Sequence, residues 1–251
     1  MRLEGRRASG WILLVALLGL WQVSALWWVR SSNWPTVSAI LQALWTSLHS
    51  GELPQVFGSS LWRMAVGYAA GAAAGVALGL LMAGQRWIRA ALEPLVELLR
   101  PIPMPAIVPP LILLLGIDHT MKVFAVAMAT FFPVLVNTVG GVRSVDRTVI
   151  DVARTLRSGR WRTVLRVVLP AAMPFIFAGL RTSLALALIV TVVAEMIAGS
   201  EGIGYYVLTM QYAMRAADMY AAIFLLAAVG YALNAFTLAI ERRVLHWYQR
   251  A

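Results

Sequence analysis

The residues best placed to act on a partner or a ligand lie between Asp146 and Pro174, where a basic stretch separates two apolar segments. Helical spacing places its apolar residues near one side and spreads its arginines over the rest. The apolar positions are Ile150, Ala153, Leu156 and Val164, and the arginines are Arg154, Arg157, Arg160 and Arg162. We expect a helix break near Ser158–Gly159, before a second basic helix that runs to Leu169–Pro170. Such helices suit docking to a cytoplasmic partner, but they fit a loop lying on anionic headgroups equally well.

Two ionisable residues, Arg181 and Glu195, fall inside one long apolar segment, where a charge is costly and usually functional. Fourteen residues separate them, or about 21 Å along a helix, so they cannot pair with each other. Arg181 could contact an anionic substrate on a translocation path, or either residue could hold helices together through ion pairs. Arg63 poses the same choice, and its place near the outer end of a segment favours snorkelling to the interface.

Prolines interrupt the chain at Pro101, Pro103 and Pro105, and again at Pro109–Pro110. Because proline lacks a donor and clashes inside helices, residues 101–105 should be extended or sharply turned. Such backbone is tolerated at membrane depth only where it is buried in protein or lines a cavity. We therefore expect these prolines to border a translocation path, with a rigid structural kink as the alternative.

The composition makes the bilayer the solvent for most of the chain: 61% of 251 residues are hydrophobic and 13% are charged. The net charge of +10 comes mostly from arginines at helix ends, so it indicates membrane topology and no nucleic-acid binding. Cysteine is absent, which excludes disulfides and thiolate sites, and the three histidines are too far apart in sequence to suggest a metal site. No phosphate-binding loop is present, so we expect no ATP or other cofactor on this chain.

These residues need an all-α, polytopic membrane scaffold, with residues 1–251 forming one domain. About six spans are predicted, at 10–29, 60–84, 101–117, 120–141, 172–198 and 219–240, with the basic loop at 142–171. The first span could instead be a signal peptide, although its length favours an uncleaved helix. Residues 37–48 should form an amphipathic helix. Gly67, Gly71, Gly75 and Gly79 lie on one face of the second span and predict close helix packing.

Basic residues give the orientation of the spans. With the N-terminus inside, the inner segments hold sixteen of the 21 basic residues, whereas the outer loops hold Arg30 and Arg215. By the positive-inside rule, both termini should be cytoplasmic, in a multi-pass protein of the bacterial inner membrane.

The basic loop resembles the "EAA" motif of ABC-importer permeases, Glu-Ala-Ala-x-x-x-Gly followed about nine residues later by an apolar residue, any residue and Leu-Pro. Counting back from Leu169–Pro170 places Asp151 at the glutamate, Ala153 at the second alanine and Arg157 at the glycine. The chain thus departs twice from the pattern, and a displaced glycine, Gly159, leaves the position of the turn open.

Other blocks are similar to the sulfonate, taurine and nitrate branch of these permeases. They are Arg100-Pro101-Ile102-Pro103, Gly179-Leu180-Arg181, Ala194-Glu195-Met196-Ile197 and Gly202-Ile203-Gly204-Tyr205. The resemblance implies a non-catalytic permease subunit for a small anion such as a sulfonate, taurine or nitrate. It implies a second permease copy, two cytoplasmic ATPases that bind ATP and magnesium, and a periplasmic or lipid-anchored binding protein. It also makes the loop around Asp151 and Leu156 an ATPase-coupling helix.

Two other classes remain as alternatives. A stand-alone carrier or channel needs no docking loop. It would be distinguished from an importer subunit by transport without an ATPase partner. A membrane enzyme would need a nucleophile with its base, or clustered metal ligands, in the spans, and no such pattern is evident.

Overall fold

The computed structural model describes residues 2–29 and 31–247, so the predicted outer-loop Arg30 and the inner Arg250 lie outside the described residues. Every regular element in the described ranges is helical. The helices are α1 (Arg2–Trp27), α2 (Val37–His49), α3 (Glu52–Gly84), α4 (Arg86–Leu99), α5 (Met104–Leu115), α6 (His119–Arg143), α7 (Arg147–Thr155), α8 (Arg160–Thr163), α9 (Leu169–Ala198), α10 (Ile203–Tyr212) and α11 (Ala216–Val244), with one π-helical turn at Val164–Val168.

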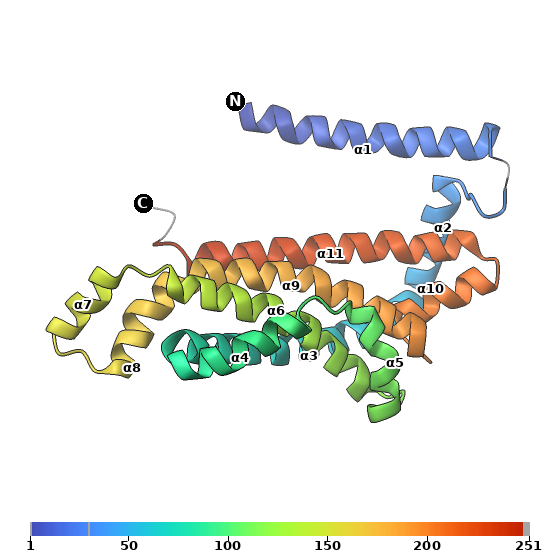
Figure 1. Ribbon diagram of the computed structural model, residues 1–251. Coiled ribbons are helices and arrows are strands. Elements are labelled where there is room, and N and C mark those ends of the chain that lie inside the picture. The colour runs from blue at the N-terminus through green and yellow to red at the C-terminus, as the bar shows by residue number, and fades with distance from the viewer. Residues whose placement is uncertain (1, 30, 248–251) are drawn as a thin grey trace.

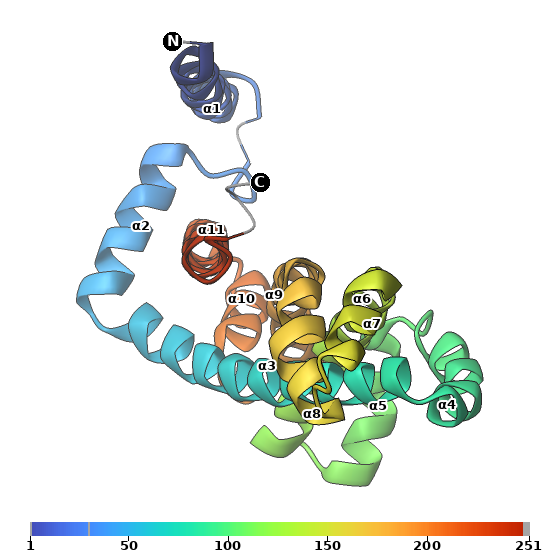
Figure 2. The same ribbon diagram turned by 90° about the vertical axis from the view of Figure 1, so that its left-hand side faces the viewer.

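Long helices that lie roughly along one axis dominate the architecture: Figure 1 shows α6, α9 and α11 side by side, and Figure 2 shows α3 crossing them at an angle. Five helical segments are long and apolar enough to cross a membrane, and α4 with α5 makes a sixth if this bent pair counts as one span. The predicted all-helical fold with about six spans is therefore confirmed. Figure 2 shows α1 standing apart from the main group of helices, linked to it through α2.

The predicted third span, residues 101–117, is replaced by two helices. Helix α5 covers only Met104–Leu115, and α4, which the sequence did not predict, precedes it at an angle of 101°. The chain turns at residues 100–103, and Pro103 is the N-cap of α5. The predicted turn is therefore found at residues 101–103, whereas Met104 and Pro105, expected to be non-helical, begin α5. Pro105 is tolerated there because the first turn of a helix needs no amide donor, and Pro109 and Pro110 lie inside α5.

The glycine face predicted in the second span packs against α6 along its whole length. A Cβ at Gly67 would lie 2.6 Å from the carbonyl oxygen of Val123, and one at Gly75 would lie 2.9 Å from that of Phe131. At Gly71 it would collide with the carbonyl group of Ala127. The two backbones touch because these positions carry no side chain, which confirms the predicted close packing.

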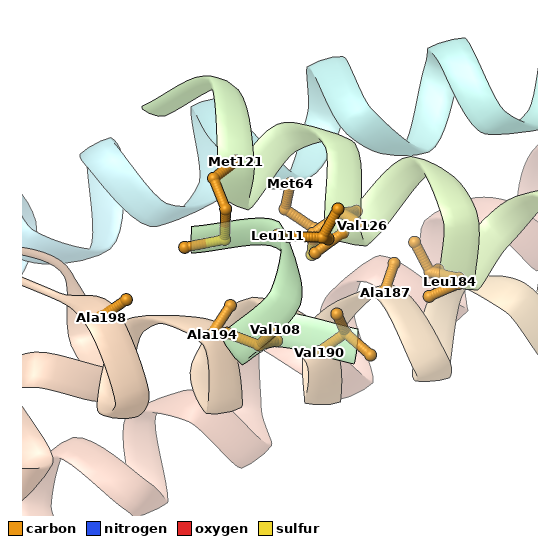
Figure 3. Close-up of a cluster of buried hydrophobic side chains, with 12 residues drawn as sticks. Met64, Val108, Leu111, Met121, Val126, Leu184, Ala187, Val190, Ala194 and Ala198 are labelled. Carbon is orange, nitrogen blue, oxygen red and sulfur yellow. The ribbon is translucent and has the colours of Figure 1, made fainter. Parts of the chain in front are cut away.

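An apolar core fills the space where α3, α5, α6 and α9 meet. Figure 3 shows Val108 of α5 beside Val190 and Ala194 of α9, and Met64 of α3 near Val126 of α6. Val108 and Val126 are fully buried. Short helix α5 is therefore held by packing against the long helices, although its own prolines are exposed.

Helix α2 is the amphipathic element predicted at residues 37–48. Thr36 caps it, accepting a hydrogen bond from the Ala39 amide at 3.2 Å. Its buried residues, Ile40 and Ser47, lie on the side that packs against α3 and α11. The opposite side exposes Leu41 and Trp45.

Candidate functional site

The predicted docking loop projects from one end of the helical group as two short helices, α7 and α8. Figure 1 shows them at the same end as the start of α1, the end of α11 and the α3–α4 junction. Helix α7 exposes Val149 and Val152, whereas its Ala153 is buried. Leu156, in the turn that follows α7, has 76% of its surface accessible. Trp161 of α8 is equally exposed. Large exposed apolar side chains at this projecting end form a surface suited to a protein partner.

The backbone at the end of α7 shows what happens where Arg157 replaces the motif glycine. This residue has φ = 52°, the left-handed conformation that favours glycine. The Ser158 amide donates to the Ala153 carbonyl at 3.0 Å, so Arg157 occupies the position after the helix where glycine is preferred. Gly159 lacks a positive φ, and a Cβ there would meet nothing within 4 Å. The backbone turn thus falls at the position aligned with the motif glycine, not at the displaced glycine.

The joint between α8 and the long helix α9 is a π-helical turn. The Leu169 amide donates to the Val164 carbonyl, five residues back. Pro170 follows with no amide hydrogen, so the α-helical hydrogen-bond ladder is interrupted where the loop enters the span. The predicted Leu169–Pro170 pair therefore lies at the junction between the projecting loop and α9.

Arg181 and Glu195 lie apart on α9, as their spacing predicted. Arg181 is 40% exposed, and its Nη1 lies 3.7 Å from Glu241 Oε2 on α11. Glu195 is fully buried. Among the predicted path residues, Arg181 and the three prolines Pro101, Pro103 and Pro105 are therefore accessible on this chain, whereas Glu195 is enclosed by other helices.

Glu195 joins three helices. Its carboxylate accepts hydrogen bonds from Arg63 Nη2 at 2.8 Å, from the Ser60 hydroxyl at 2.8 Å and from the Gly204 amide at 3.0 Å. The Ser60 oxygen in turn accepts from the Ile203 amide at 2.9 Å. The carboxylate thus joins the end of α9 to α3 and to the first turn of α10. A buried charge needs such an opposite charge and several donors.

The prediction that Arg63 snorkels to the interface is wrong. Its side chain is 1% exposed, and besides Glu195 it donates to Ser59 Oγ at 3.1 Å and to Glu201 Oε1. Its Nη1 also lies 3.1 Å from His119 Nδ1 at the start of α6. In the loop between α9 and α10, the hydrogen bond from Arg63 lowers the pKa of Glu201. Arg63 is therefore the centre of an ionic cluster of α3, α6, α9 and the loop that follows.

The glycines of the Gly202-Ile203-Gly204 block make room for this carboxylate. Gly202 has φ = 102°, and any Cβ there would collide with the Glu195 carboxylate. At Gly204, a Cβ would lie 2.8 Å from the Glu195 Cβ and would also collide with the Val192 carbonyl. Sequence reasoning missed the roles of Ser60 and Glu201. The available signal was the spacing of Ser60 and Arg63, three residues apart on one helix face.

The comparison with known families decides the class of the chain. The model of a family described as "Binding-protein-dependent transport system inner membrane component" matches residues 75–246, from within α3 to just past α11. The chain belongs to this family. It is a non-catalytic ABC importer permease, a multi-pass protein of the inner membrane.

Curated relatives and a solved structure agree with this permease family. The "Putative aliphatic sulfonates transport permease protein SsuC" of Bacillus subtilis (strain 168) is 34% identical over 248 residues, covering 97% of this chain and 90% of the relative. The "Bicarbonate transport system permease protein CmpB" of Synechococcus elongatus is 32% identical over 188 residues, covering 74% of this chain and 68% of the relative. An inward-facing structure of the MetNI methionine ABC transporter matches with a TM-score of 0.65 at 18% identity, covering 76% of this chain and 95% of that chain, which shows the same fold.

Proposed function

We propose that this permease pairs with a second copy to form the translocation path for a small anion, driven by two cytoplasmic ATPases that dock on α7 and α8. A binding protein would deliver the anion at the opposite end, where α2 and α10 lie. Both termini would be cytoplasmic. The observation that carries the proposal is the α7–α8 projection: Leu156 is exposed in the turn between α7 and α8, and Trp161 is exposed at the start of the apolar segment Trp161–Ala198. This segment enters α9 through a joint interrupted at Pro170.

The docking surface is tested by co-purifying the permease with the ATPase encoded beside it, using Leu156→Asp against Leu156→Met. Because Leu156 is 76% exposed, neither change should disturb the fold of the permease. A charge at the centre of an apolar contact should reduce ATPase retention at least tenfold, whereas methionine keeps the apolar surface. If wild-type permease retains no ATPase and still transports in liposomes, a stand-alone carrier replaces the importer proposal.

For the transported solute, we propose a small anion such as a sulfonate, taurine, nitrate or bicarbonate. The sulfonate and bicarbonate relatives carry names of anion transporters, and the accessible Arg181 offers a cation within a span. Its separation of 3.7 Å from Glu241 leaves donors of the guanidinium for another oxyanion. Arg181 would bind the solute transiently as it passes along the translocation path. Glu195 would hold helices α3, α9 and α10 together and would not contact the solute.

The anion contact is tested by uptake of a labelled sulfonate into proteoliposomes holding the full transporter. Arg181→Gln should raise the KM about tenfold or more, and Arg181→Lys should retain part of the affinity because it keeps the charge. Glu241→Gln removes the same ion pair without removing the cation, so it controls for loss of the α9–α11 contact. Unchanged uptake by Arg181→Gln at normal expression would refute the role of Arg181 on the path.

A further inference from the structure

A basic cleft that the transport proposal does not use lies between the start of α4, the end of α6 and the start of α7. It encloses about 1100 Å³ and is lined by the arginines Arg86, Arg89, Arg143 and Arg147. The acidic residue of its lining, Glu93, is already paired with Arg89 at 3.2 Å. Within the described part of the chain, the other three arginines have no ion pair, so the cleft offers unpaired cations to an anion.

We propose that this cleft binds the phosphate headgroup of an anionic phospholipid from the inner leaflet. Guanidinium groups match the oxygens of a phosphate in a bidentate geometry. Basic pockets between spans on the cytoplasmic side are suited to acidic lipid headgroups. The cleft is also an inlet between helices, with small and apolar side chains beside its arginines, such as Ala83, Ala90 and Val142. These give the glycerol and upper acyl chains of a lipid an apolar wall.

The depth of the arginines supports a lipid as the source of the phosphate. Arg86 follows the end of α3 at Gly84, and Arg143 is the last residue of α6, so both flank helices that can span the membrane. Trp87, which also lines the cleft, is 88% exposed, as is typical of an anchor at the headgroup level. Figure 1 shows the α3–α4 junction and α7 at the same end of the long helices.

The place of the cleft distinguishes it from the proposed ATPase surface. Leu156 and Trp161, which carry that surface, do not line it, whereas Ile150 on α7 does. A lipid headgroup held by Arg86, Arg143 and Arg147 would bridge the first half of the broken span, the end of α6 and the coupling helix. Acidic lipids would therefore stabilise one arrangement of α7 relative to α4.

The proposal is tested by native mass spectrometry of the full-length permease in micelles carrying phosphatidylglycerol or phosphatidylcholine. The wild type should retain phosphatidylglycerol preferentially. Arg86→Gln with Arg147→Gln should lower this retention about thirty-fold, since each arginine near an acidic surface adds appreciably to binding. The matched control, Arg242→Gln with Arg243→Gln, removes two exposed arginines of α11 outside the cleft and should stay within about twofold of wild type.

Three results would overturn the lipid site. Equal retention of the two lipids by the wild type would show no preference for an acidic headgroup. Equal loss in the cleft variant and the control would show a general charge effect. Binding of inorganic phosphate to lipid-free protein with the same arginine dependence, together with no retention of phosphatidylglycerol, would identify a soluble anion. Because the readout is lipid retention by the permease alone, it is independent of the ATPase and solute proposals.

Discussion

The Arg63–Glu195 ion pair is the contact on which the end of the helical group depends. Both side chains are buried, and the carboxylate also holds Ser60 and the first turn of α10. Arg63→Met should lower the free energy of unfolding by about 3 kcal/mol, because it leaves the buried Glu195 carboxylate without its opposite charge. Thermal unfolding of the purified permease in detergent micelles measures this loss.

A double-mutant cycle separates the ion pair from simple loss of packing. Arg63→Met with Glu195→Leu removes both charges, so the double variant should be more stable than the sum of the single losses allows. Strictly additive losses would show that the two charges do not interact and that the cluster is held by its other hydrogen bonds.

At the end of α7, the left-handed conformation of Arg157 costs free energy that glycine would not. Arg157→Gly should therefore stabilise the helix end, slowing amide exchange at Leu156 and Ser158 about fivefold in the full-length permease. Arg157→Ala is the matched control, since it removes the guanidinium but keeps the Cβ. If alanine slows exchange as much as glycine does, the cause is the side chain and not the backbone.

Among whole helices, α3 and α6 pack closely along their glycine face, and Gly71 lies in contact with the backbone of Ala127. Gly71→Ala should lower stability by about 1–3 kcal/mol, because the added methyl must push the helices apart. Gly58→Ala is a control on the same helix: a Cβ there meets nothing within 4 Å, so the change should stabilise α3 by about 0.5–1 kcal/mol. The melting temperatures of the two variants should move in opposite directions. A shift of both in the same direction would contradict the close packing of α3 against α6.

The elements that the sequence predicted are those specified by local patterns. The glycine repeat of α3, the prolines before α5 and the apolar spacing of α2 each depend on neighbours within one helix. Helix α4 was missed because four charged residues lower its hydropathy: Arg86, Arg89, Glu93 and Glu97.

The buried cluster could not be predicted in the same way. Glu195 lies 132 residues from Arg63, and Glu201 lies 138 residues from it. A pairing over such a separation leaves no periodic trace in one sequence, so Arg63 was assigned to the interface by position alone. The position of the turn at Arg157 could not be predicted either. A left-handed residue after a helix is usually glycine, so an arginine at that place gives no sign of this conformation in the sequence.

On the scale of the whole molecule, orientation in the membrane decides whether α7 and α8 can meet a cytoplasmic ATPase. The sequence assigns sixteen of the 21 basic residues to the inner segments, so by the positive-inside rule we expect the end that carries α7 and α8 to face the cytoplasm. The natural chain has no cysteine, so a single introduced thiol reports its own position without background. Gly159→Cys lies in the exposed turn between α7 and α8, and Tyr212→Cys lies at the exposed end of α10.

A membrane-impermeant maleimide added to intact spheroplasts should label Tyr212→Cys and leave Gly159→Cys unlabelled until the membrane is opened. Both variants should then react fully, which controls for burial of the thiol within the protein. The opposite pattern would place α7 and α8 outside the cell and remove ATPase docking on them. The cleft of Arg86, Arg143 and Arg147 lies at that same end, so the opposite labelling pattern would also exclude the inner leaflet as the source of the bound lipid.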